Sequence, residues 1–288
     1  MKTDELFAQI TDALLVKMEA GKLPWHKPWS AETAAPHNLT GRAYRGANAF
    51  WLDLLRDSKG YSSPVWMTYN QAQAAGGSVK KGEKGTAVFF WNFSEKSNPD
   101  TGKVEKVVYA KAYTVFNLDQ TENVRHKAAD PLARPSVFER NDAAEALVTA
   151  TGAQIVHGGD RACYVPISDV IRMPVKEAFT TSDAYYSTLF HEIGHWTGSD
   201  KRLKREFGKR FGDMAYAAEE LVAELTAAYV CGALGFDNPA RDDHAAYLQG
   251  WIKVLKADPK AFITAAGKAQ AAADHILQAV EQEERIAA

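Results

Sequence analysis

The spacing of apolar positions near the N-terminus predicts an amphipathic helix over residues 4–20, which Gly21 and Pro24 end. The segment from Leu23 to Asn48 is rich in Pro, Gly and aromatic residues, so we interpret it as an ordered loop that leads into a helix near residues 47–57. The apolar positions that mostly share the face of the first helix are Leu6, Phe7, Ile10, Leu14, Val16 and Met18.

A helix and two strands are expected next. Thr68 is a suitable N-cap for TYNQAQAAGG, a short helix that Gly76 and Gly77 end. The apolar run TAVFFWNF predicts a strand, and the alternation in VEKVVYAKAYTVFNL predicts a second strand that pairs with it across the turn NPDTGK. Residues 1–118 therefore predict an α+β domain with a small antiparallel sheet.

The second half of the chain has a different pattern. Residues 119–137 contain few large apolar residues and two prolines, which is typical of a connection and places a domain boundary near residue 130. We therefore expect one domain over 1–130 and another over 131–288, mainly helical with a small sheet, in an α+β chain. The helices expected in it cover 138–151, 181–198, 213–234, 240–256 and 259–284.

Composition excludes several classes of protein. The chain has no apolar run long enough to span a membrane, and its polar N-terminus is unlike a secretion signal, so we expect a cytoplasmic protein without a membrane partner. Cys163 and Cys231 form neither a disulfide framework nor a metal-binding pair in sequence. Residues 1–130 hold 17 basic against 14 acidic residues, an excess that permits a nucleic-acid partner without requiring one.

The segment His191-Glu192-Ile193-Gly194-His195 is an HExxH motif. On a helix, positions four residues apart share a face, so His191 and His195 are placed to hold one ion, for which zinc is the expected metal. Glu192 is then the candidate general base, because a carboxylate beside the ion can take a proton from the attacking water. The alternative is a chance pair of surface histidines, but the preceding SDAYYSTLF predicts a partly buried helix.

A third ligand is expected from the acidic helix that follows. Glu220 and Glu224 share a face, so we expect Glu220 to complete the metal shell and Glu224 to accept a hydrogen bond from a ligating histidine. Glu219, about 100° around the helix, is the competing ligand. These glutamates could instead form a solvated face, although the apolar residues around them favour burial.

Four other residues near these helices are weaker candidates. Asp213 and His244 lack a metal-binding spacing. A phenol of Tyr185 or Tyr186 could stabilise an oxyanion, but packing is the commoner role of a helical tyrosine, so neither is assigned to the site.

Longer segments carry a family resemblance. YYSTLFHEIGHWTGSDKRLKR and FGDMAYAAEELVAELTAAYVCGALG resemble the metallopeptidase domain of ArdC-type antirestriction proteins. GKLPWHKPW, GRAYRGANAFWL, WMTYNQAQAAGGSVKKGEKGTAVFFW and YTVFNLDQT resemble the N-terminal region of that family, which binds single-stranded DNA, and also the N-terminal part of certain plasmid DNA primases. The resemblance spans nearly the whole chain.

The resemblance implies a plasmid- or phage-borne protein that protects incoming DNA from host restriction. It implies a zincin-like second domain, with His191, His195 and Glu220 as ligands of zinc or another divalent metal and Glu192 as general base. It implies single-stranded DNA as a partner, whereas a protein substrate associated with DNA or restriction is left open.

Single-stranded DNA is commonly held by basic side chains and by aromatic rings that stack on its bases. Phe50, Trp51 and Trp91 occupy apolar helix or strand positions, so we expect them in the core, and residues in loops are better stacking candidates. The residues predicted to contact DNA are Arg42, Tyr44, Arg45, Lys80, Lys81 and Lys84.

Three functions compete at this point. The leading one combines DNA binding with a metal-dependent peptidase. The second is a non-catalytic DNA-binding protein whose metal site is structural or regulatory, and Glu192 argues against it because a structural site has no need of a general base. A two-metal nuclease ranks last, because HExxH supplies the ligands of only one ion.

Overall fold

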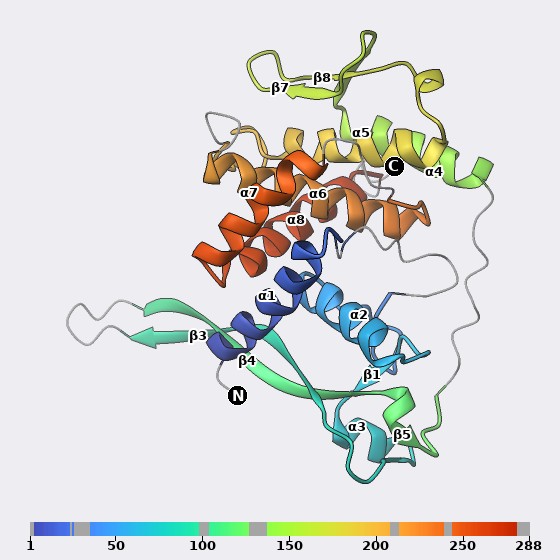
Figure 1. The fold of residues 1–288 in the computed structure, drawn as a ribbon, viewed down its shortest axis with the longest axis vertical. Helices are drawn as coiled ribbons and strands as arrows, with labels where there is room; N and C mark the ends of the chain where they lie inside the picture. The colour runs from blue at the N-terminus through green and yellow to red at the C-terminus, as the bar shows by residue number, and fades with distance from the viewer. Residues whose placement is uncertain are drawn as a thin grey trace. The chain divides into compact units, whose positions relative to one another are not determined.

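A computed structural model describes the chain over residues 3–23, 25, 35–97, 104–126, 137–207, 213–238 and 244–280 (Figure 1). The chain forms two compact units. The first comprises residues 1–12, 35–44 and 48–129, and the second comprises residues 13–34, 45–47 and 130–288. The boundary near residue 130 stays a prediction. The second unit also contains segments from the start of the chain. The fold is α+β.

The first unit begins with α1, Thr3–Glu19, whose residues from Ala13 onward belong to the second unit. All but one of the apolar positions predicted for its buried face are buried. The exception is Val16, which is 69% exposed because it lies two positions from Leu14 and therefore on the opposite side of the helix. The hydroxyl of Thr3 donates to the carbonyl of Ala110 and so ties the start of α1 to strand β4.

The predicted helices and strands of the first unit occur in the predicted order, together with short elements that were not predicted. They are α2 (Ala47–Lys59), β1 (Trp66–Met67), α3 (Tyr69–Ala74), β2 (Ser78–Val79), β3 (Thr86–Ser97), β4 (Val104–Asn117), the 3-10 turn η2 (Leu118–Gln120) and β5 (Thr121–Glu122). The predicted N-cap is confirmed, because the Thr68 side chain accepts a hydrogen bond from the backbone N–H of Gln71 and the Gln71 side chain accepts one from that of Thr68.

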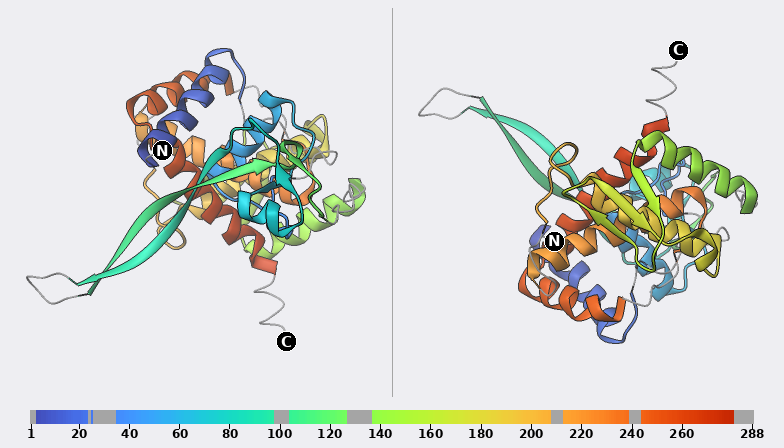
Figure 2. Two further views of the ribbon diagram at one scale, coloured as in Figure 1. Left: turned by 90° about the horizontal axis from the view of Figure 1, so that it is seen from below. Right: turned by 90° about the horizontal axis from the view of Figure 1, so that it is seen from above.

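The pairing of β3 with β4 is also confirmed. The strands run antiparallel from Thr86 opposite Val115 to Ser97 opposite Val104, and β1 pairs with the other side of β4. Both views in Figure 2 show β3 and β4 as one long, twisted ribbon. A second small sheet pairs β2 with β5. The core beneath the larger sheet consists of Leu52, Trp66, Val88 and Val115.

Some tryptophans lie where the sequence does not predict them. Phe50 and Trp51 are buried as expected, but Trp91 is 53% exposed, so its assignment to the core is wrong. Trp25 lies outside the long helices yet is buried in the second unit, where its ring is 5.5 Å from that of Trp251. A period-two pattern does not say which strand face is covered, and a loop aromatic is buried when a helix elsewhere supplies a partner.

The second unit is mainly helical with a small sheet. Its elements are α4 (Val137–Thr151), β6 (Gln154–His157), β7 (Cys163–Val165), β8 (Val170–Met173), the 3-10 turn η3 (Lys176–Ala178), α5 (Ser182–Thr197), α6 (Met214–Leu234), α7 (His244–Ala257) and α8 (Ala261–Leu277). The strand order is β6-β8-β7, with β6 parallel and β7 antiparallel to β8, so β7 is an edge strand. In the part of the chain that the structure describes, each helix is too short or too polar to span a membrane.

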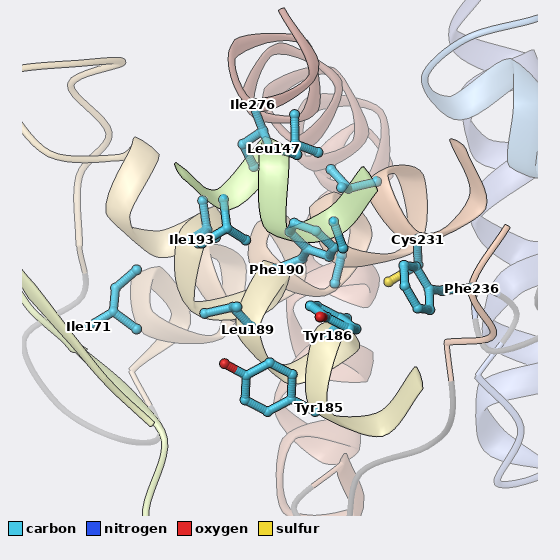
Figure 3. Packing of buried hydrophobic residues seen from close by; sticks show 14 of the residues in the cluster. Leu147, Ile171, Tyr185, Tyr186, Leu189, Phe190, Ile193, Cys231, Phe236 and Ile276 are labelled. Carbon is cyan, nitrogen blue, oxygen red and sulfur yellow. The ribbon is translucent and has the colours of Figure 1, made fainter. Parts of the chain in front are cut away.

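The core of this unit lies between α5, α6 and the sheet. Aromatic side chains dominate its centre, where the ring of Tyr186 lies 4.9 Å from that of Phe236 and 6.3 Å from that of Phe190 (Figure 3). A Cβ on Gly194 of α5 would lie 3.3 Å from both Ala223 Cα and Thr226 Cβ of α6. Glycine at this position therefore allows the two helices that carry the motif residues to approach closely.

Candidate metal centre

Helix α5 presents both motif histidines on one face. The helix begins after Thr181, whose side chain accepts a hydrogen bond from the backbone N–H of Ala184, so the motif lies in the third and fourth turns. His191 and His195 are one turn apart, and their Nε2 atoms lie 3.1 Å from each other. His191 is buried, so its imidazole faces neighbouring helices rather than solvent.

Glu220 of α6 faces both imidazoles. Its carboxylate oxygens lie 3.4 Å from His191 Nε2 and 3.6 Å from His195 Nε2. Two ligands bound to zinc at about 2.0–2.1 Å in a tetrahedral arrangement lie about 3.4 Å apart. The three separations are close to that value, and the donor set of two imidazoles and one carboxylate is one that zinc accepts, so the residues fit a divalent ion.

A further carboxylate stands behind each imidazole. Oε1 of Glu224 lies 3.1 Å from His191 Nδ1, an ion-pair distance without the alignment of a good hydrogen bond. Oε1 of Glu219 lies 3.3 Å from His195 Nδ1. Glu219, the competing ligand in the sequence, therefore lies on the opposite ring nitrogen of His195 from Glu220. A carboxylate in this position fixes the tautomer of a histidine and leaves Nε2 for the ion.

Arg205 is a site residue that the sequence did not reveal. This buried guanidinium donates to both oxygens of Glu219, with Nη2 at 2.8 Å from Oε1 and Nε at 3.0 Å from Oε2. It also donates to the carbonyl of Gly194 at 2.6 Å and to the hydroxyl of Thr197 at 2.8 Å. Its position in a loop carries no periodic signal, so only the tertiary structure links it to the motif.

The charges of the site favour a bound cation. Burial lowers the pKa of His195, but hydrogen bonds to Glu219 and Glu220 outweigh burial, and the pKa rises to about 10. Burial raises the pKa of Glu220, but the two imidazoles outweigh it and hold that pKa well below its ordinary value. The buried carboxylates therefore attract positive charge, which a proton or a metal ion can supply.

Glu192 lies beside the three candidate ligands and points to the small sheet. Its Oε2 accepts a hydrogen bond from the backbone N–H of Tyr164 in β7 at 2.8 Å. Only 7% of the residue is exposed, yet it lines the same cavity as His191, His195 and Glu220. The carboxylate is thus held in one orientation at the edge of an accessible space.

That cavity has a volume of about 560 Å³. Tyr216 lies one turn before Glu220 on α6, and its hydroxyl is 3.3 Å from that of Tyr247. Sequence reasoning missed both phenols, although the four-residue spacing from Glu220 could have identified Tyr216. The lining residues are Asp160, Arg161, Ala162, Cys163, Tyr164, Pro166, Thr188, His191, Glu192, His195, Phe207, Tyr216, Glu219, Glu220 and Tyr247.

The weaker candidates have other positions. Tyr185 and Tyr186 lie in the aromatic core, and the Tyr185 hydroxyl is 2.8 Å from Nε2 of His157. Asp213 caps α6 by accepting a hydrogen bond from the backbone N–H of Ala215. His244 begins α7, and its side chain lies outside the described part.

Two family models match consecutive parts of the chain. The N-terminal domain of anti-restriction factor ArdC matches residues 4–116, and a zincin-like metallopeptidase matches residues 142–268. The crystal structure of the metal-free antirestriction ArdC protein from the R388 plasmid is 39% identical and superposes with a TM-score of 0.80, over 96% of this chain and 98% of that one. The chain belongs to the ArdC family of antirestriction proteins.

Other relatives extend this ArdC-family assignment. The Mn(II)-bound structure of the R388 protein is 38% identical, with a TM-score of 0.78 over 95% of this chain and 97% of that one. The uncharacterized protein y4eC of Sinorhizobium fredii is 36% identical over 94% of this chain and 91% of its own length. The DNA primase TraC of Escherichia coli is 38% identical over 96% of this chain, which spans only 27% of the primase.

The residues predicted to contact DNA all lie within the range that matches the ArdC N-terminal domain. Arg42, Lys80, Lys81 and Lys84 are exposed, and Lys80 donates to the carbonyl of Asp119 at 2.8 Å. Tyr44 is partly buried against the core of the first unit, and burial raises its pKa to about 12. Arg45 belongs to the second unit, where it forms an ion pair with Asp274 of α8.

Proposed function

We propose that this ArdC-family protein binds single-stranded DNA through its first unit and cleaves a DNA-associated protein at a zinc centre in its second unit, protecting incoming DNA from restriction. The observation that carries the peptidase half is the buried trio His191, His195 and Glu220 beside Glu192, in an accessible cavity. A restriction enzyme is one protein whose cleavage would give this protection.

His191, His195 and Glu220 would hold the ion, while Glu219 and Glu224 orient the two imidazoles. When bound, the ion polarises the scissile carbonyl and makes a water molecule more acidic. Two phenols that line the cavity, Tyr216 and Tyr247, would donate hydrogen bonds to the carbonyl oxygen as it becomes negative.

Glu192 performs the proton transfers in this proposal. Its carboxylate takes one proton from water as the oxygen attacks the carbonyl carbon, and later gives that proton to the amine that leaves. The N–H of Tyr164 occupies one carboxylate oxygen and leaves the other for this task. Because the donor is a backbone N–H, no second side chain has to adopt a particular rotamer to hold Glu192 in this orientation.

The first prediction separates catalysis from metal binding. Glu192→Gln keeps an acceptor for the N–H of Tyr164 but removes the base, so metal content and thermal stability should stay within error while cleavage falls by a factor of about 10² or more. The measurement is gel analysis of candidate DNA-associated proteins incubated with each variant, with and without single-stranded DNA. Glu177→Gln, an exposed carboxylate of the same unit, is the matched control and should cleave like the wild type.

Two outcomes would contradict the peptidase proposal. Equal cleavage by the wild type and Glu192→Gln would remove Glu192 from the reaction. Absence of cleavage by either protein, with single-strand binding retained, would favour the alternative of a DNA-binding protein whose metal centre is structural or regulatory.

A further inference from the structure

Aromatic side chains gather on one face of the β3–β4 ribbon. In an antiparallel pair, residues directly opposite each other point to the same side of the sheet. Phe90 lies opposite Lys111, Asn92 opposite Tyr109, and Val88 opposite Tyr113. We call Phe90, Tyr109, Lys111 and Tyr113 the ribbon aromatic face.

The exposure of side chains on this face increases along the ribbon. Val88 and Val115 are buried against Leu52 and Trp66 in the core of the first unit. Farther along the same face the aromatic residues are exposed, Phe90 by 46%, Tyr109 by 45% and Tyr113 by 36%. Partly exposed rings bury less apolar area than core rings and therefore contribute less to the stability of the fold.

The aromatic rings on this face lie close to one another. The centroids of Phe90 and Tyr113 are 5.4 Å apart, and Tyr44 extends the group at 6.4 Å from Phe90. The ammonium of Lys111 lies 5.4 Å from the centroid of Tyr113. Among the ribbon side chains described on this face there is a cation and no carboxylate, so a polyanion meets no repulsion from them.

We propose that the ribbon aromatic face is a site for single-stranded DNA, with bases stacked on Phe90, Tyr109 and Tyr113 and a backbone phosphate paired with Lys111. The inference rests on the DNA-binding half of the proposed function. Exposed rings beside a cation fit a single strand, because its bases present their flat faces. A duplex hides the same faces inside its base stack, so the site discriminates against double-stranded DNA.

The site differs from the loop residues that the sequence favoured. Of the six, Tyr44 is the one whose ring contacts this face. Trp91 is similarly exposed but belongs to the opposite face, where its ring lies 6.3 Å from that of Phe7 in α1. Trp91 therefore serves as a control, because it is an exposed ring on the same strand that points away from the ribbon aromatic face.

The test pairs a change in the protein with a change in the DNA. Binding of the full chain to an oligo(dT) of about 15 nucleotides is compared with binding to an abasic strand of equal length, which keeps the phosphates and lacks the bases. The double variant Phe90→Leu with Tyr113→Leu keeps apolar side chains and removes two rings. It should bind oligo(dT) about 30-fold more weakly and bind the abasic strand within about 2-fold of the wild type.

The matched controls are Trp91→Leu and Tyr69→Leu, the latter an exposed ring on α3, and both should keep the wild-type preference for oligo(dT). Lys111→Gln should lower the dependence of log affinity on log salt by about one unit. Thermal unfolding of each variant shows whether the fold is retained, and Phe90→Leu alone serves as the test if the double variant is unstable.

The outcomes distinguish this site from the wider proposal. If the wild type binds no single strand, the DNA-binding function itself is wrong. If the wild type binds oligo(dT) and the double variant binds it equally well, the function stands and this site is overturned. Tighter binding of oligo(U) than of oligo(dT) would overturn the assignment of the site to DNA.

Discussion

At the residue scale, the two carboxylates behind the imidazoles differ in their surroundings. Glu219 is held between His195 and the buried guanidinium of Arg205. Glu224 lies against His191, with its Oε1 3.1 Å from Nδ1 of that histidine. Replacing each of these glutamates by glutamine therefore distinguishes an effect on metal binding from an effect on the stability of the fold.

We predict that Glu224→Gln and Glu219→Gln each lower the affinity for zinc by about 10- to 100-fold, because each removes the group that orients one ligand. Glu219→Gln should also lower the free energy of unfolding by about 3–5 kcal/mol, since it leaves the buried charge of Arg205 without its partner. Calorimetric metal titration and chemical denaturation provide the two measurements. Unchanged zinc affinity in both variants would contradict the assigned roles.

The sequence could predict part of this site. HExxH spacing places His191, Glu192 and His195 on one helix, and helical periodicity pairs Glu220 with Glu224. Periodicity does not say which imidazole each carboxylate meets, because that depends on how α5 and α6 pack. Arg205 and Tyr247 come from a loop and a separate helix, so no local pattern connects them to the motif.

At the element scale, the close approach of α5 and α6 depends on Gly194. We predict that Gly194→Ala lowers the free energy of unfolding by about 1–3 kcal/mol and weakens zinc binding, because the new methyl group presses on Ala223 and Thr226. Gly267→Ala in α8 is the matched control. Its new Cβ meets nothing within 4 Å, so it should be stabilising by roughly 0.5–1 kcal/mol.

Denaturation and metal titration of the two glycine variants test this prediction together. Equal stability and zinc affinity in Gly194→Ala and the wild type would show that the helices tolerate a wider separation than we infer.

Elements with a strong local signal were predictable, and the arrangement of short strands was not. The capped helix after Thr68 and the β3–β4 hairpin each carry a sequence pattern, and both are present. Strands β6, β7 and β8 have only three or four residues each. Their order and mixed direction depend on packing against α5, which periodicity alone does not encode.

At the scale of the whole molecule, the compact units do not coincide with two continuous halves of the chain. Residues 13–34 belong to the second unit, and among them Trp25 packs against Trp251 and Phe262. The sequence predicts a boundary in the polar segment near residue 130, but no sequence pattern indicates that residues 13–34 pack in the second unit. Contacts between residues more than 200 positions apart leave no local trace.

We therefore predict that a fragment of residues 131–288 unfolds at a lower temperature than the same unit in the full chain. Trp25 is 1% exposed, and removal of a buried tryptophan side chain typically costs about 3–5 kcal/mol. Thermal unfolding followed by near-ultraviolet circular dichroism is the measurement, with Trp25→Ala in the full chain as the comparison. A fragment as stable as the full chain would show that the early segment is dispensable.

The hydrogen bond between the N–H of Tyr164 and Glu192 also has a consequence for the edge of the small sheet. Strand β7 is an edge strand, and the unpaired backbone groups of such an edge are a template for pairing with another chain. Glu192 occupies one of these groups, because its Oε2 accepts the hydrogen bond that the N–H of Tyr164 could otherwise donate to a second strand. The carboxylate proposed to move protons thus also satisfies a backbone N–H at the edge of the small sheet.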